Sequence, residues 1–178
     1  MMIDRNDAIS FLKQHQPMPD DNNLSKDLIN KYDDVRKFFL ANPDEECIPL
    51  FLNSFGERDG FGVYQLIEDV INKFEKSKVL PYLLKALKSG YRSIRYWNTQ
   101  IAASFPDEKL FEPLEKLLNE NDVDIRFAAI TSIAQLALSG IKYYDVLDCL
   151  ENALNNETEE DVLEFLQEVI NDIKLKNS

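Results

Sequence analysis

The sequence predicts an all-α solenoid in which helical hairpins stack one on another. Prolines begin three apolar runs at intervals of 32 residues: Pro49, Pro81 and Pro113. A second apolar run in each unit begins 31 residues after the previous one: at Val63, Ile94 and Ile125. A repeat of this length with two amphipathic segments is typical of α-solenoids. No stretch shows the two-residue alternation of a strand over a useful length, which supports the all-α class.

Two irregular helices are predicted before the first repeat. The first spans residues 4–15, and a polar segment with two prolines ends it. The second spans residues 24–40, with Ser25 or Asn23 as its N-cap. Because a solenoid needs a polar cover at its open end, we expect residues 1–41 to form an N-terminal helical cap.

Four helical hairpins follow the cap and complete one predicted domain over residues 1–178. Their predicted ranges are 42–75, 76–105, 106–139 and 140–178. Within the second hairpin, Leu84 is expected to be fully buried between repeats. The linker of the first hairpin runs from Gly56 to Gly62 and holds three of the five glycines. It is predicted to be a mobile loop that is either a plain turn or a contact site.

The charge of the chain disfavours generic nucleic-acid binding and favours a basic protein partner. The 20 basic and 32 acidic residues give a net charge of −12, which repels a phosphate backbone. The same field speeds encounter with a basic protein, although acidity also serves solubility. The charge is uneven, because residues 76–106 contain six basic and no acidic residues, whereas residues 141–178 contain three and ten. This contrast favours a polar recognition surface.

The sequence offers no recognisable catalytic or metal-binding set, so we predict a non-enzymatic protein without a cofactor. The single histidine, His15, lies near the end of the first helix, where it compensates the helix dipole. Cys47 and Cys149 have no CxxC partner or nearby histidine and are expected to be buried thiols. No apolar run is long enough to cross a membrane. We expect a cytoplasmic protein and favour a monomer over an oligomer.

Two of the predicted hairpins carry a family motif, in which a proline in the first helix precedes an apolar–Arg pair that opens the second. The motif residues are Pro81, Ile94 and Arg95, and then Pro113, Ile125 and Arg126 followed by Ala128 and Ala129. Over residues 76–138 the chain therefore resembles the HEAT-repeat family, although Tyr64 and Leu163 replace the arginine in the outer hairpins. The resemblance implies a right-handed superhelix whose second helices line a concave ligand surface. It also implies that Arg95 and Arg126 either brace adjacent repeats or serve binding.

Alignment of the four second helices predicts which residues lie on that concave surface. The candidate binding residues are Tyr64, Gln65, Glu68, Asp69, Arg92, Arg95, Tyr96, Thr99, Gln100, Phe127, Ile130, Thr131, Glu164 and Glu168. Tyr96, Phe127 and Ile130 would form an apolar spot flanked by carboxylates, as in an interface hot spot with a polar rim. Tyr96 and Phe127 would be adjacent across two repeats. The alternative is that curvature buries Phe127 and Ile130 between neighbouring helices.

These observations predict a protein-binding module that recognises a partner with a basic surface. The size, acidity and architecture of the chain are also similar to those of some bacterial immunity proteins, which bind and block a cognate toxin. An inhibitor of this type is the leading hypothesis. A scaffold or adaptor subunit of a protein complex is the alternative within the same class. A small-molecule binder or a HEAT-like enzyme would instead need a deep pocket lined by Tyr64, Tyr96 and Trp97.

Overall fold

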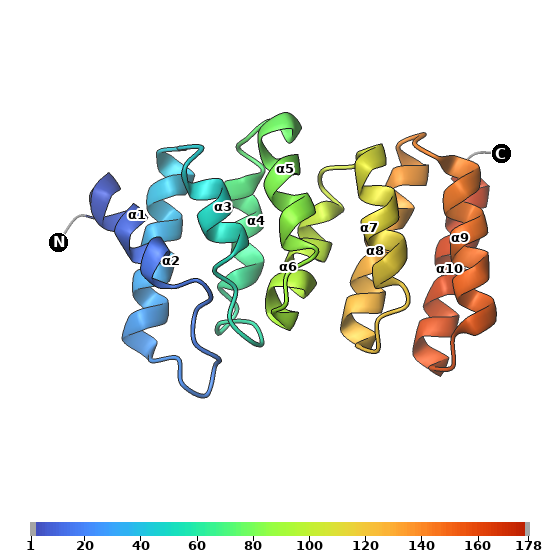
Figure 1. Cartoon of the computed structure of the whole chain (residues 1–178), viewed down its shortest axis with the longest axis horizontal. Coiled ribbons are helices and arrows are strands. Elements are labelled where there is room, and N and C mark those ends of the chain that lie inside the picture. The colour runs from blue at the N-terminus through green and yellow to red at the C-terminus, as the bar shows by residue number, and fades with distance from the viewer. Residues whose placement is uncertain (1–2, 177–178) are drawn as a thin grey trace. The chain divides into compact units, whose positions relative to one another are not determined.

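The computed structural model describes residues 3–176, which form helices and loops without any strand (Figure 1). The α-helices are α1 Arg5–Gln14, α2 Lys26–Ala41, α3 Cys47–Leu52, α4 Ile67–Ile71, α5 Lys76–Ala86, α6 Arg92–Ala102, α7 Phe111–Leu117, α8 Val123–Leu138, α9 Tyr143–Asn156 and α10 Glu160–Lys176. Two short 3-10 helices, η1 Tyr64–Leu66 and η2 Glu108–Leu110, precede α4 and α7. The helices follow one another as hairpins, so the predicted all-α class is confirmed.

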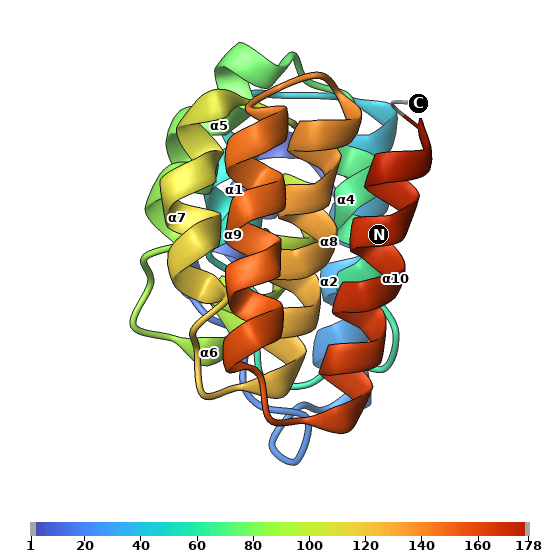
Figure 2. The ribbon, with the colours of Figure 1, turned by 90° about the vertical axis from the view of Figure 1, so that its right-hand side faces the viewer.

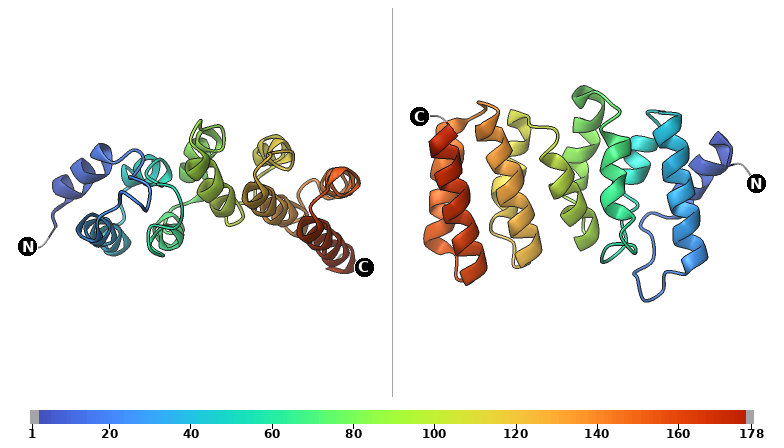
Figure 3. Two further views of the ribbon diagram at one scale, coloured as in Figure 1. Left: turned by 90° about the horizontal axis from the view of Figure 1, so that it is seen from below. Right: turned by 180° about the vertical axis from the view of Figure 1, so that it is seen from behind.

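The chain divides into two compact units, Met1–Asn98 and Thr99–Ser178, and the boundary falls within α6. In the first unit, α3 packs against α1 and α5, whereas α2 packs against α1 and α4. Figure 3 shows α1, α3 and α5 in one layer of this unit and α2 with α4 in the other. Each hairpin thus contributes one helix to each layer.

Aromatic rings fill the core of the first unit. Tyr32 and Tyr64 meet edge to face with ring centroids 5.7 Å apart, and Phe55 meets Tyr64 at the same distance. The hydroxyl of Tyr32 shares a 2.6 Å hydrogen bond with Ser54 Oγ, so this polar group is satisfied although it is buried. Trp97 contacts Tyr64 at 6.1 Å. Tyr64 and Trp97 are therefore core residues. This packing contradicts the deep pocket that they would have to line in a small-molecule binder or an enzyme.

The two N-terminal helices begin where side-chain caps are available. Asp4 Oδ1 accepts the Asp7 amide at 2.9 Å, and Ser25 Oγ accepts the Leu28 amide at 3.2 Å. Ser25, rather than Asn23, is therefore the N-cap of α2. At the other end of α1, His15 Nδ1 donates to the carbonyl oxygen of Phe11 at 2.7 Å, so the histidine closes the helix as a polar cap.

The first hairpin differs from its prediction in the second helix and in the linker. The helix expected to start at Val63 is reduced to η1 and the five-residue α4. The linker is not a loosely held loop, because Trp97 Nε1 donates to the Arg58 carbonyl oxygen at 3.0 Å. The Gly60 amide also donates to Asp21 Oδ1 at 3.3 Å. Residues 56–62 are thus fixed to the core and to the preceding segment.

Two side chains correct the predicted facing of the helices. Leu84 is only half-buried, and its neighbour Leu83 is fully buried instead. Successive residues on a helix are separated by about 100°, so a small error in the position of the core axis exchanges one leucine for the other. Cys47 and Cys149 are buried as predicted. Burial raises the pKa of each thiol to about 12, and the neighbouring Glu115 adds to the effect at Cys149.

The second unit is built around α8. This helix packs against α7, α9 and α10, and α9 also packs against α10. Figure 2 shows α7 and α9 in one layer of this unit and α8 and α10 in the other. Ala128 and Ala129, the small residues of the predicted motif, are both buried in this packing. One groove of the unit is lined by residues of α7 and α9 and another by residues of α8 and α10.

Candidate functional site

Net charge is divided very unequally between the two units. Residues 1–98 contain 15 acidic and 14 basic residues, a net charge of −1. Residues 99–178 contain 17 acidic and 6 basic residues, a net charge of −11. The second unit therefore carries almost all of the negative field that would attract a basic partner.

An apolar groove with a volume of about 200 Å³ lies between α8 and α10, and we call it the α8–α10 groove. Its lining residues are Thr131, Ala134, Gln135, Leu138, Phe165, Val169, Asp172, Ile173 and Lys176. Phe127 extends the apolar lining, since its ring centroid lies 5.3 Å from that of Phe165. Both phenylalanines are half-buried, so each ring keeps an accessible edge.

Carboxylates of α10 lie in the α8–α10 groove or next in sequence to its lining residues. Glu164 and Glu168 are exposed and directly precede Phe165 and Val169, which belong to the apolar lining. Asp172 lies in the lining itself, one helical turn further along. An apolar centre with a charged rim is the usual anatomy of a protein-binding surface.

Four of the predicted binding residues, Phe127, Thr131, Glu164 and Glu168, lie at or beside this groove. Two other candidates in the second unit were wrongly predicted to lie on the binding face. Ile130 is 1 % exposed and Thr99 is fully buried, so neither lies on an open face. Ile130 faces inward because α8 is covered by three helices, a wider contact than one hairpin partner provides. The carbonyl oxygen of Thr99 accepts a hydrogen bond from Ser132 Oγ.

The predicted residues of the first unit lie on the η1–α4 segment and on α6. Tyr64 is 1 % exposed and belongs to the aromatic core, so its assignment to the binding face is wrong. Gln65 and Asp69 are exposed and Glu68 is half-buried on the short η1–α4 segment. Three more candidates on α6 are half-buried: Arg92, Arg95 and Tyr96.

Three of the predicted residues, Arg92, Tyr96 and Gln100, lie on α6. Arg92 lies over the ring of Tyr96, with its guanidinium carbon 5.1 Å from the ring centroid. Tyr96 and Phe127 belong to different units, so their adjacency stays a prediction. Gln100, the last candidate, is half-buried.

A larger acidic groove of about 840 Å³, the α7–α9 groove, was missed by sequence reasoning. Its lining residues are Glu108, Lys109, Phe111, Glu112, Glu115, Lys142, Asp145, Asp148, Cys149 and Asn152. Five carboxylates outnumber two lysines there, and one of the lysines, Lys142, lies 5.2 Å from the centroid of the Phe111 ring. The signal was present as acidic residues three and four apart on the first helices of two hairpins.

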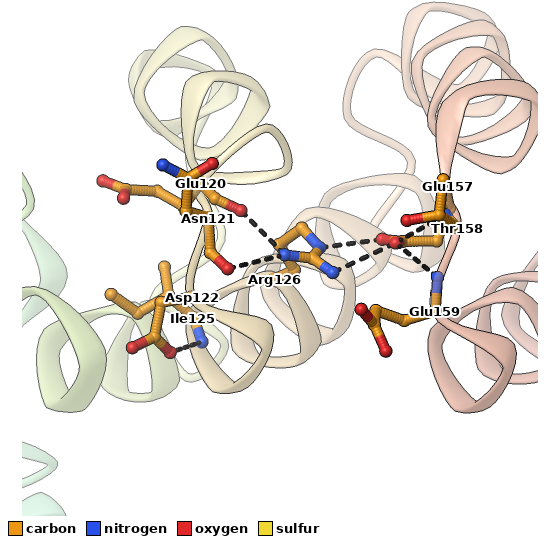
Figure 4. A network of polar contacts seen from close by, with 8 residues as sticks. All are labelled: Glu120, Asn121, Asp122, Ile125, Arg126, Glu157, Thr158 and Glu159. Atoms are coloured by element: carbon orange, nitrogen blue, oxygen red, sulfur yellow. Dashed lines mark hydrogen bonds and ion pairs between the residues drawn. The ribbon is translucent and has the colours of Figure 1, made fainter.

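Arg126 forms a polar network rather than an open binding site (Figure 4). Its Nη1 donates to the carbonyl oxygens of Glu120 and Asn121 at 2.9 and 3.1 Å. Its Nε and Nη2 donate to Glu157, whose Oε1 also accepts the amides of Thr158 and Glu159 at 2.9 and 3.0 Å. Arg126 is only 9 % exposed, so the bracing role fits it better than ligand binding.

The part of the chain that the structure describes contains neither a candidate metal site nor a candidate membrane-spanning helix. Between residues 3 and 176, no cluster of three or more His, Cys, Asp or Glu side chains could hold a metal ion. Within the same range, no helix combines the length and apolar character of a membrane span.

The comparisons with known proteins agree with the hairpin architecture. Residues 73–171 match the family model for HEAT repeats, which covers more than half of the chain, all of α5 to α9 and most of α10. A search of curated proteins finds no match.

Proposed function

Because this chain belongs to the HEAT-repeat family, whose repeats typically mediate protein–protein interaction, we propose that its second unit binds and masks a basic protein. The observation that carries this proposal is the net charge of −11 in residues 99–178, against −1 in residues 1–98. Such a field raises the association rate with a basic partner and repels acidic competitors.

The α8–α10 groove supplies the contact surface for this function. Phe127, Phe165 and Val169 would be buried by an apolar side chain of the partner, and Glu164 and Glu168 would pair with its lysines or arginines. Truncation of a central aromatic residue in such an interface typically costs about 2 kcal/mol or more. Rim charges act mainly on the association rate.

The proposal also assigns a masking role, that of an inhibitor rather than a scaffold. An inhibitor would cover a functional basic surface of its partner, whereas a scaffold would leave the activity of the partner unchanged. Cys47 and Cys149 are buried, unpaired thiols, which suits the cytoplasm, where thiols stay reduced. A monomer in complex with one partner is the simplest assembly that this arrangement needs.

Photo-crosslinking tests the proposed function. The photoreactive residue p-benzoylphenylalanine replaces the exposed Thr131 of the α8–α10 groove, and a control protein carries it at exposed Asn30 of α2. In a lysate of the native host, position 131 should capture a basic protein that position 30 does not. Phe127→Ala should weaken the purified complex through faster dissociation, and the complex should lower the activity of the captured protein. Capture of an acidic protein, or equal capture from both positions, would contradict the proposal.

A further inference from the structure

The loop of residues 56–62 presents one aromatic side chain to solvent. Phe61 is 63 % exposed, which places its ring outside the core of the first unit. Its backbone φ is +52°, in the left-handed region that residues with a Cβ rarely occupy. Arg58 in the same loop also has a positive φ, +67°. Two non-glycine residues in this region within four positions mark the loop as locally strained.

The loop is held in this conformation from inside the first unit. The carbonyl oxygen of Arg58 accepts the indole N–H of Trp97 at 3.0 Å, and the Gly60 amide donates to Asp21 at 3.3 Å. Gly60 lies against the ring of Tyr64, where an added Cβ would come within 2.7 Å of Cζ. The position of Phe61 is therefore fixed by its neighbours before any partner arrives.

The backbone at position 61 suits glycine better than an aromatic residue. Its two neighbours are glycines with positive φ, Gly60 at +56° and Gly62 at +83°, and a glycine at 61 would remove the strain as well. The exposed ring adds little to the core. An exposed aromatic ring on a rigid loop does fit one role, because a preorganised anchor loses little conformational freedom when it binds.

The charges around Phe61 indicate the kind of partner. Glu57 and Asp59 in the loop are exposed, and Asp20 and Asp21 lie in the neighbouring segment that the loop contacts. Arg58 is the one cation among these positions. A second copy of this chain, with its own charge of −12, would be repelled by such a rim.

We propose that Phe61 is an aromatic anchor that inserts into an apolar pocket bordered by basic residues on a folded protein partner. The inference rests on the proposed function only for the basic character of the partner. It adds a contact in the first unit, separate from the α8–α10 groove of the second unit.

The strain part of the proposal is tested without a partner. Phe61→Gly should raise the melting temperature of the whole chain, because glycine accepts a positive φ without steric conflict. Phe61→Ala keeps the unfavourable backbone position and should not reproduce this gain. If Phe61→Gly destabilises the protein, the ring belongs to the fold and the anchor proposal is overturned.

The binding part uses p-benzoylphenylalanine in place of Phe61 itself, with the same residue at Asn30 as the control. Position 61 should crosslink to an apolar pocket with lysine or arginine at its border. Against the purified protein captured in this way, Phe61→Ala and Phe61→Gly should each raise Kd at least about tenfold, as expected for a hot spot. Tyr144→Ala, which removes a ring that is 79 % exposed on α9, should leave Kd unchanged.

The outcomes separate the two proposals. If position 131 captures a basic protein whose Kd is insensitive to Phe61→Ala and Phe61→Gly, the anchor is overturned and the proposed function stands. If position 131 captures no protein, and position 61 captures a basic protein whose Kd rises with both Phe61→Ala and Phe61→Gly, the anchor stands and the role of the α8–α10 groove fails. Capture at position 61 of nothing, or only of a second copy of this chain, also overturns the anchor.

Discussion

Arg126 binds both carboxylate oxygens of Glu157, with Nε 2.7 Å from Oε2 and Nη2 3.0 Å from Oε1. Nη1 of the same guanidinium donates to the Glu120 carbonyl oxygen, six residues earlier, at 2.9 Å. Arg95, one repeat before Arg126, makes the same contact with the carbonyl oxygen of Ser89, also six residues earlier and at 2.9 Å. The arginines of the HEAT motif thus brace the turn before their own helix, and Arg126 also reaches the next hairpin.

Removal of Arg126 should destabilise the protein strongly. The side chains of Arg126 and Glu157 are only 11 % and 8 % exposed, so Arg126→Ala takes the guanidinium away from a largely buried carboxylate and from two carbonyl oxygens. We expect a loss of about 3–5 kcal/mol in denaturant unfolding of the whole chain. Lys142→Ala breaks a more exposed pair with Asp145 and should cost less than about 1 kcal/mol. Equal losses in the two variants would contradict the bracing role.

The contribution of Glu157 should depend on pH. Burial by itself raises the pKa of Glu157, but hydrogen bonds from the Glu159 amide, Arg126 and the Thr158 amide bring it below the ordinary value of 4.5. The ionised form is therefore favoured in the folded state, so its stabilisation is present above pH 4.5 and is lost as pH falls through the folded pKa. Glu157→Gln lacks this stabilisation at every pH. The difference in unfolding free energy between wild type and Glu157→Gln should be constant near neutrality and shrink in acid, and a difference unchanged down to pH 3 would be inconsistent with this account.

Helices and their starts could be predicted from the sequence because their causes are local. The cap at Ser25 or Asn23 and the paired apolar runs depend on residues a few positions apart, and the structure has the helices close to their predicted ranges except for the second helix of the first hairpin. Burial on a particular face depends on neighbouring hairpins, which a single period does not specify. Ile130 is buried for this reason, and Tyr64, aligned with the motif arginines, belongs instead to an aromatic core. The two grooves could not be predicted from the sequence for the same reason, since each is formed by helices from two hairpins.

The corrected facing of α5 gives a direct stability test. Leu83 is fully buried, so Leu83→Ala should cost about 2–5 kcal/mol through lost burial and the cavity it leaves. Leu84 is half-buried, and Leu84→Ala should cost clearly less. Guanidinium melts of the two variants make a matched comparison, because the same atoms are removed at adjacent positions. A larger loss from Leu84→Ala would restore the original assignment.

The N-terminal helices should be required for an intact first unit. α1 packs against α2 and α3, and Arg5 and Lys13 both pair with Glu46 just before α3. Deletion of residues 1–41 would remove Phe39, whose ring packs against that of Phe51, and would expose Phe51. It would also remove Tyr32, which shares a buried hydrogen bond with Ser54. We expect partial unfolding or aggregation by circular dichroism and light scattering. A monomeric truncated protein with unchanged thermal stability would show that these helices do not serve as a cap.

The central claim, that the second unit recognises a basic protein by charge, is tested most directly by the salt dependence of Kd. The protein captured through position 131 is titrated over a series of salt concentrations against wild type and the rim variant Glu164→Gln/Glu168→Gln. A double variant of exposed carboxylates on α2, Asp27→Asn/Asp34→Asn, serves as the charge-matched control. The account predicts that wild-type Kd rises steadily with salt and that the rim variant alone has a shallower slope, with slower association at low salt. A Kd that does not change with salt, or the same slope in all three proteins, would contradict it.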